Sequence, residues 1–163
     1  MTIPYRPLAV GLVALLFSGL FLARAQAGGG HFYPPVSDPA VREECGSCHL
    51  AFAPSMLPAS SWRTMMGDLK NHFGDDASVD AATAAHITAY LTANAADSGG
   101  QRYGAKLMRS VSAQSAPLRI TELPGWIRKH REVSASEWKS KKVGSKANCT
   151  ACHADAARGY YDE

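Results

Sequence analysis

The sequence predicts an all-α fold of short helices and loops with little or no sheet, and three observations lead to this prediction. Apolar residues recur at spacings of three and four between Pro- and Gly-rich segments, as they do on one face of a helix. No segment shows the sustained alternation of polar and apolar residues that is typical of a half-buried strand. The motif Cys-x-x-Cys-His occurs twice, at 45–49 and 149–153, and contains all four cysteines of the chain.

Residues 1–27 have the pattern of a secretory signal peptide that is cleaved from the mature protein. Arg6 precedes the apolar run 8–22, and the small residues Ala25 and Ala27 follow as a cleavage-site pattern. The run is shorter than the roughly 20 residues of a membrane-spanning helix, although an uncleaved anchor is the alternative. No second run of that length follows, so we expect the mature chain to have no membrane span and to work outside the cytoplasm.

A first helix is expected to begin at Asp38 and Pro39, because Asp caps helix N termini and Pro fits the first helical position. The helical spacing continues until Pro54 and Pro58 interrupt it. The residues on this face are Val41, Cys45, Cys48, His49 and Phe52.

A second helix is expected to be capped by Ser60 or Ser61 and to stop at Gly74. Its apolar face carries Trp62, Met65, Met66, Leu69, His72 and Phe73. A third helix is predicted over 80–95, with Ile87, Tyr90 and Leu91 as its core residues.

Residues 96–104 are the predicted boundary between two halves, 28–98 and 99–163, because they combine adjacent glycines with a polar run. The sign of the net charge also changes there, from −5 in the first half to +6 in the second. Residues 105–123 show no clear pattern. Each half contains one of the two Cys-x-x-Cys-His motifs.

Two further helices are predicted in the second half. Trp126, Ile127, His130 and Val133 indicate a short helix after residues 122–125. Ser145 is expected to cap a last helix that Gly159 ends. Cys149, Cys152, His153 and Ala156 would share one face of it.

The spacing of Cys-x-x-Cys-His suits covalent attachment of a haem, because positions i, i+3 and i+4 of a helix point the same way. The two thiols add to the haem vinyl groups, and the histidine that follows binds the iron. We therefore expect two covalent haem c groups. Their attachment residues are Cys45, Cys48, Cys149 and Cys152, with His49 and His153 on the irons.

Three other interpretations fit the cysteines less well. A zinc ribbon would need its cysteine pairs closer together, at roughly 15–20 residues, and a thioredoxin-like dithiol needs a βαβ setting. Disulfide-closed loops would leave His49 and His153 without a role.

A second axial ligand for each iron has several candidates. His72 closes an apolar helical face, and His130 lies one turn after Trp126. His31 and His86 are weaker candidates by their settings. Methionine is a further alternative, since Met56, Met65 and Met66 lie near these segments, although methionine on an apolar face usually fills a core.

Longer stretches resemble a known family, the small periplasmic dihaem cytochromes c called DHC. They include EECGSCHLAF, LPASSW, LKNHFGDDAS and AYLTANAAD in the first half, and PLRITELPGWIRKHREV and SKANCTACH in the second. The resemblance covers the chain from about Val36 to Cys152 except around 99–116. It implies that both irons are bound by two histidines, and the matching positions are His72 and His130. His49 and His72 are 23 residues apart, as are His130 and His153. We therefore expect each of these pairs to bind one iron, with one haem in each half.

The resemblance also implies a function in electron transfer and not in catalysis, because an iron with two protein ligands has no open position for a substrate. The implied donor is a membrane cytochrome b or quinol oxidoreductase, and the implied acceptor is a small oxygen-binding monohaem cytochrome c in the periplasm. We expect a monomer that does not bind nucleic acid. The alternative function is a haem enzyme or gas sensor with one five-coordinate iron that acts on peroxide, nitrite, oxygen or nitric oxide.

Overall fold

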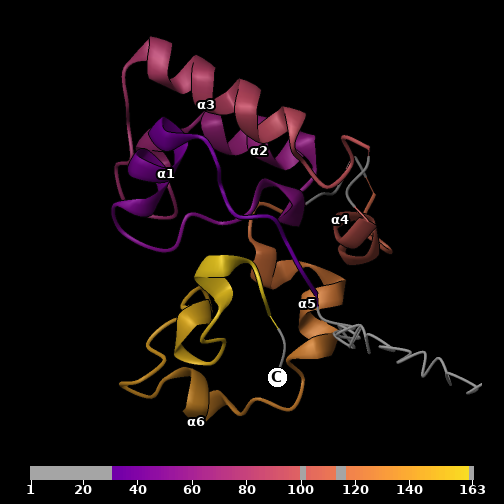
Figure 1. The fold of residues 1–163 in the computed structure, drawn as a ribbon. Helices are drawn as coiled ribbons and strands as arrows, with labels where there is room; N and C mark the ends of the chain where they lie inside the picture. The colour runs from indigo at the N-terminus through magenta and orange to yellow at the C-terminus, as the bar shows by residue number, and fades with distance from the viewer. Residues whose placement is uncertain (1–30, 100–101, 113–116, 162–163) are drawn as a thin grey trace, which may run out of the picture.

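The computed structural model describes residues 31–99, 102–112 and 117–161 (Figure 1). Within these ranges the chain forms six α-helices and several 3-10 turns but no strand, which confirms the predicted fold class. The extended pairings there are two isolated bridges, Phe32 with Tyr160 and His72 with Asp75. No helix in the described ranges is long and apolar enough to cross a membrane. The predicted signal peptide, 1–27, lies outside the described residues.

The first half builds one side of the molecule from three helices. These are α1 (Pro39–Gly46), α2 (Ala59–Met66) and α3 (Ala81–Ala93), with 3-10 turns at Pro54–Met56 and Leu69–Asn71. In Figure 1 they lie together at the top, where α3 packs along α2 and also contacts α1.

The second half builds the other side from shorter elements. They are α4 (Arg102–Leu107), α5 (Pro124–Lys129) and α6 (Ala135–Trp138), with 3-10 turns at Ile120–Glu122, Cys149–Ala151 and Ala156–Arg158. α4 contacts both α5 and the turn at Pro54–Met56, so it joins the two sides. The prediction did not include α4 or α6, and α4 begins inside the segment that was predicted to be a boundary.

Side-chain caps begin two of the helices of the first half. Asp38 accepts a hydrogen bond from the Val41 N–H at 3.0 Å, which confirms the predicted start of α1. Asp80 caps α3 in the same way through the N–H groups of Ala82 and Thr83. The cap predicted for α2 is wrong, because the buried Ser61 hydroxyl instead donates to the distant Pro117 carbonyl at 2.8 Å.

The helices around the two cysteine motifs are shorter than predicted. α1 ends at Gly46, before Cys48 and His49, although the apolar spacing continues past it. The last predicted helix, from Ser145, is replaced by two 3-10 turns. Apolar residues at helical spacing therefore predict longer helices than the structure has at both motifs. Short helices are only marginally stable, so the spacing alone does not maintain them.

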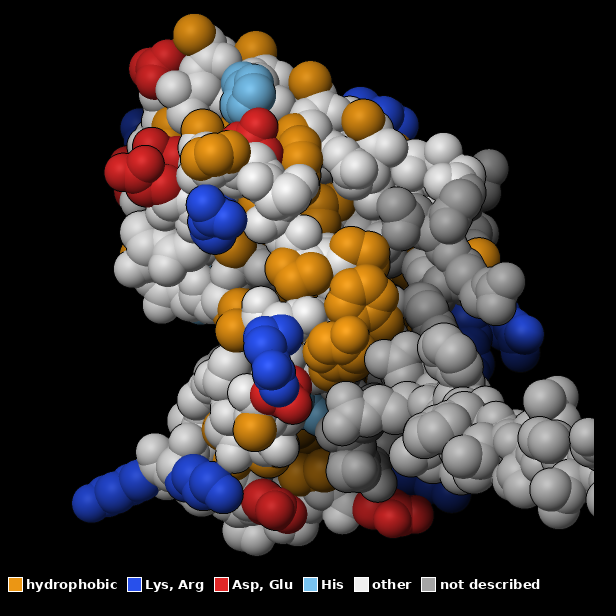
Figure 2. All heavy atoms as spheres, viewed as in Figure 1, with side chains coloured by type: hydrophobic (Ala, Val, Ile, Leu, Met, Phe, Trp, Pro, Cys, Tyr) orange, Lys and Arg blue, Asp and Glu red, His pale blue; other side chains and the backbone are white. Residues whose placement is uncertain are grey.

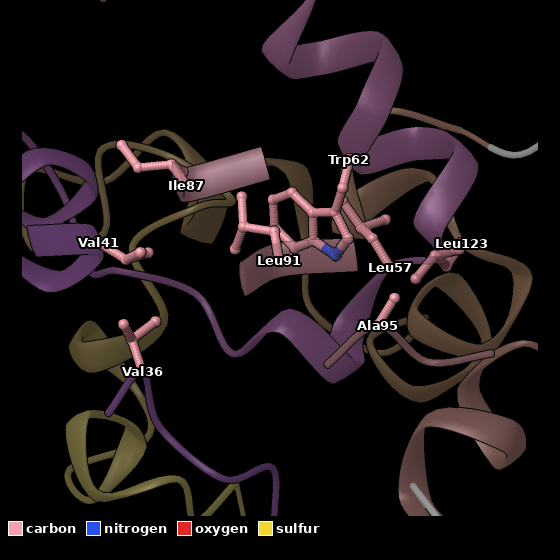
Figure 3. Close-up of a cluster of buried hydrophobic side chains, with 8 residues drawn as sticks. All are labelled: Val36, Val41, Leu57, Trp62, Ile87, Leu91, Ala95 and Leu123. Carbon is pink, nitrogen blue, oxygen red and sulfur yellow. The ribbon is translucent and has the colours of Figure 1, made fainter. Parts of the chain in front are cut away.

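A core cluster shared by both halves holds these short elements together. Figure 3 shows Trp62 of α2 between side chains of α3 and residues from outside the three helices, and the Trp62 indole N–H donates to the Pro54 carbonyl at 2.8 Å. Leu123 belongs to the second half, yet it is fully buried in this cluster. The predicted halves thus touch through apolar contact, and their division into two haem-binding units stays a prediction. The cluster consists of Val36, Val41, Leu57, Trp62, Ile87, Leu91, Ala95 and Leu123.

The start of the described chain packs against its end. The Tyr33 N–H donates to the Gly159 carbonyl at 2.9 Å, and the Tyr33 ring contacts Tyr161 edge-on at 5.6 Å. Gly159 has a φ of +89°, and a Cβ there would collide with the Tyr33 carbonyl. Only glycine therefore fits this close approach.

Candidate haem-binding sites

The first candidate site is a pair of facing histidines in the first half. The ring centroids of His49 and His72 lie 6.1 Å apart, and the ring planes differ by 20°. His49 follows the end of α1, and its Nδ1 lies 2.8 Å from the Leu50 carbonyl oxygen. Because a carbonyl only accepts hydrogen bonds, Nδ1 carries the proton and Nε2 is the metal-binding nitrogen.

A tight turn positions His72. Its backbone N–H and carbonyl both bond to Asp75, at 2.9 and 3.2 Å. Phe73 and Gly74 between them have positive φ angles of 57° and 111°, which glycine accepts readily and Phe73 accepts with strain. Gly74 therefore lies in a turn that follows the 3-10 segment Leu69–Asn71. The prediction that Gly74 ends a long helix is wrong, because α2 already ends at Met66.

The second candidate site pairs His130 with His153 in the second half. Their ring centroids are also 6.1 Å apart, but the ring planes differ by 84°. His130 is the residue that ends α5, and its Nδ1 lies 2.9 Å from the Trp126 carbonyl oxygen. The Tyr161 ring centroid lies 5.7 Å from that of His153.

The distance between the rings fits one metal ion in each pair. Metal–imidazole nitrogen bonds of about 2.0–2.1 Å, together with the distance from that nitrogen to the ring centre on each side, place two rings that share a metal ion roughly 6 Å apart, centre to centre. Both pairs match this spacing. No group of three or more His, Cys, Asp or Glu side chains that could hold a metal ion occurs in the described part of the chain. Two protein ligands are the number that a haem iron needs, since the porphyrin supplies the other four.

The cysteines occupy equivalent positions beside the two pairs. All four lie in the described ranges as free thiols, and in each motif the first is half-buried and the second exposed. Burial raises the pKa of the Cys45 and Cys149 thiols. An exposed and a half-buried thiol three residues apart suit a haem whose edge reaches the surface.

Burial around His72 favours the neutral form that binds a metal. Burial, and then the neighbouring His49, lower the pKa of His72, and Arg119 acts in the same direction against Asp75. The His72 Nδ1 is buried and has no hydrogen-bond partner among the described residues. Buried polar atoms are rarely left without a partner, so this orphan also fits a site that is completed by a bound group.

The other candidate ligands have different neighbours. His86 Nε2 lies 2.9 Å from the Asp38 carboxylate. Met56 is buried in a small cluster with Tyr33 and Ala53, while Met65 and Met66 pack against the main core. The His31 carbonyl accepts from the Tyr161 N–H at 3.3 Å, which places the His31 backbone near the second site.

Neighbouring side chains support the histidines, and of these only Trp126 stood out in the sequence, one turn before His130. The ring centroids of Trp126 and His130 lie 4.1 Å apart, and the ring planes differ by 16°. The Arg119 guanidinium lies 3.8 Å from the centre of the Phe73 ring, next to His72. No local pattern predicts this contact, because the two residues come from different halves of the chain.

A small helical protein with two Cys-x-x-Cys-His motifs and two facing histidine pairs has the features of a c-type cytochrome with two haems. Residues 41–161 match the family model described as dihaem cytochrome c, so the chain belongs to the dihaem cytochrome c family. As a member it carries two covalently bound haem c groups and is an electron-transfer protein with redox protein partners.

Solved structures agree with this assignment. The chain is similar to a dihaem cytochrome c from Rhodobacter sphaeroides, with 47% identity, a TM-score of 0.70 and coverage of 78% of this chain and 98% of that one. A second structure, of DHC purified from the same organism, gives 46% identity, a TM-score of 0.64 and coverage of 77% and 98%. A third structure, of a dihaem cytochrome type c from Shewanella baltica OS155, has 38% identity and a TM-score of 0.61. The match covers 76% of this chain and 86% of that one. No curated protein sequence matches the chain.

Proposed function

We propose that the protein is a periplasmic electron carrier in which each haem iron is bound by two histidines. His49 and His72 bind one iron, and His130 and His153 bind the other. Cys45 with Cys48 and Cys149 with Cys152 attach the two haems. The observation that carries this proposal is the ring spacing of 6.1 Å in both pairs, which leaves room for one metal ion and no additional ligand.

The roles of the residues follow from this arrangement. A bound haem would supply a one-electron couple, and two histidines on each iron would leave no open position for oxygen or peroxide. Hydrogen bonds from Nδ1 of His49 and His130 to backbone carbonyls hold the rings and increase their basicity. Low reduction potentials are favoured by histidine pairs, in contrast to histidine with methionine.

The direction of transfer that we propose rests on the resemblance to small periplasmic dihaem cytochromes c. Electrons arrive from a membrane cytochrome b or quinol oxidoreductase and leave to a small oxygen-binding monohaem cytochrome c. The signal-peptide pattern of residues 1–27 supports export to the periplasm, and we propose that the exported protein is a monomer.

The test is the spectrum of the protein purified from the periplasm. We expect two covalent haems per chain, both low-spin at neutral pH in the ferric state, and no fast binding of carbon monoxide after reduction. A substantial high-spin component with rapid carbon monoxide binding would overturn the electron-carrier proposal and favour the haem enzyme or gas sensor. A methionine-to-iron charge-transfer band would instead assign one of the irons to a methionine.

A further inference from the structure

We infer that Trp126 is a positioning residue that holds the His130 ring perpendicular to the His153 ring, so that the two irons differ electronically although their ligands are the same. The inference rests on the proposed ligation by two histidine pairs. It concerns the angle between the rings, which the identity of the ligands does not determine.

The contrast between the sites is large. The rings of His49 and His72 are within 20° of parallel, whereas those of His130 and His153 are 84° apart. The centroid distance is 6.1 Å in both, so the difference is in rotation and not in spacing.

Two contacts to Trp126 restrain the rotation of the His130 ring, which also lies 6.0 Å from the Trp138 ring. The first is the hydrogen bond from His130 Nδ1 to the Trp126 carbonyl oxygen. The second is ring stacking, with the ring centroids 4.1 Å apart and the ring planes at 16° to each other. A side chain held by both a directional bond and a flat surface cannot rotate about its Cβ–Cγ bond without losing one of them. The His130 ring therefore takes its plane from the indole.

The Trp126 ring is itself held in place. It is partly buried against the main core cluster, and the Trp138 ring lies 5.5 Å away. The Lys146 ammonium lies 5.8 Å from the Trp126 ring and 5.9 Å from the Trp138 ring, within the range of cation–π attraction. The indole plane is thus determined by residues of α5, α6 and the segment before the second motif.

At the first site the hydrogen bond and the aromatic contact come from two different residues. His49 bonds to the carbonyl of Leu50, the next residue, and its ring stacks on Phe52 at 5.1 Å and 26°. The His72 ring is tilted by 56° from Phe73. The near-parallel arrangement therefore follows Phe52, as the perpendicular one follows Trp126.

The ring angle changes the energies of the iron d orbitals. Each imidazole has one filled π orbital perpendicular to its plane, and it raises the d orbital with which it overlaps. Parallel rings act on the same d orbital and separate it from its partner, whereas perpendicular rings act on both and leave them nearly degenerate. The parallel site should give a rhombic low-spin ferric signal, and the perpendicular site should give a highly anisotropic signal at low field.

Electron paramagnetic resonance of the frozen ferric holoprotein tests the inference. We expect the wild type to show both signals in equal amounts. Trp126→Leu keeps apolar bulk and the backbone carbonyl but removes the stacking surface, so the highly anisotropic signal should shift or broaden towards rhombic while the other is unchanged. Trp126→Phe retains an aromatic face and should largely restore it. Phe52→Leu is the matched control and should alter only the rhombic signal.

The outcomes separate this inference from the proposed function. Two low-spin rhombic signals in the wild type would overturn the inference and leave the histidine ligation intact. A highly anisotropic signal that is unchanged in both Trp126 variants would show that the indole does not set the ring plane. A high-spin signal in the wild type would refute the ligation itself. Circular dichroism of each variant excludes misfolding as the cause of a change.

Discussion

Each of the four histidines proposed as ligands lies at or just beyond the end of a helical segment. His49 follows α1, His72 and His130 end their segments, and His153 follows the 3-10 turn Cys149–Ala151. The carbonyls at such ends can accept from a side chain, because fewer backbone N–H groups follow them. The Trp126 carbonyl accepts both the backbone N–H of His130, at 3.1 Å, and its ring Nδ1–H, at 2.9 Å. For His130, the end of α5 therefore both places the ring and leaves Nε2 as the nitrogen that faces the metal.

The ligand assignment can be tested by removing one ring at a time. His72→Ala and His130→Ala should each convert one haem to high-spin and leave the other low-spin, because each iron loses one axial nitrogen. His86→Ala and His31→Ala are the controls and should leave the absorption spectrum unchanged. If His130→Ala stays fully low-spin, the second site uses another ligand.

The cap of α1 predicts a pH dependence of stability. The Val41 N–H first, and His86 second, lower the pKa of Asp38 from its usual 3.8. The folded state thus binds this proton less tightly than the unfolded state, and the stabilisation is present above pH 3.8 and is lost as the pH falls through the lower folded value. Urea unfolding should show Asp38→Ala to be less stable than the wild type at pH 7.

That difference should shrink in acid as the carboxyl of the wild type becomes protonated. Glu43→Ala, which removes an exposed acid of the same helix, is the control and should have little effect at either pH. An Asp38→Ala difference that is independent of pH would contradict this account.

At the scale of elements, the helices are too short to be stable alone, so packing must stabilise them. The longest, α3, has 13 residues, and helices of this length are marginal in water. Ile87 and Leu91 of α3 are buried against α2, where Trp62 is the largest side chain of the core cluster. The contact between α2 and α3 therefore stabilises both helices.

Truncation of this contact should be costly. Leu91 is 3% exposed, and Leu91→Ala should lower the free energy of unfolding by about 2–5 kcal/mol, because it removes buried apolar surface and leaves a cavity. Chemical denaturation followed by circular dichroism measures the change. Ala89→Ser, on the exposed side of the same helix, should cost far less, and equal effects would contradict the packing argument.

The whole molecule combines a shared apolar interior with an uneven charge distribution. The first half has a net charge of −5 and the second of +6. Figure 2 shows Lys and Arg side chains projecting from the part that holds α6, with acidic side chains on both parts of this face. Ile127 is 53% exposed beside the basic residues Arg128, Lys129 and Arg131. An exposed apolar side chain with a charged surround is typical of a docking surface for a redox partner.

Reversal of the basic charges should therefore slow electron transfer to an acidic partner. Changing Lys139, Lys141 and Lys142 to Glu should decrease the bimolecular rate constant several-fold at low salt. At high salt the effect should fade, since the screening length is already about 10 Å at 0.1 M. Stopped-flow kinetics with the physiological acceptor makes the measurement. Replacing Arg42 and Arg63 of the first half by Glu is the control, and equal rates for all proteins at low salt would exclude steering by the second half.

Local features of the sequence determined the helical class, the two motifs and several helix starts. Asp38 before Pro39 predicted the start of α1, and Cys-x-x-Cys-His predicted both attachment sites, because these depend on interactions within a few residues. The apolar setting of His72 and the neighbourhood of Trp126 also indicated which other histidines belong to the sites. Such signals are short-range, so they are present in the sequence itself.

Only the tertiary structure decided where the helices stop and how the rings face each other. Ser61 bonds to Pro117 instead of capping α2, and Arg119 reaches Phe73 across the two halves. The angles of 20° and 84° depend on which aromatic surface each histidine packs against, and that follows from the packing of whole segments. A spacing of residues along the chain determines which side chains can meet, but their relative rotation is set by contacts between residues far apart in sequence.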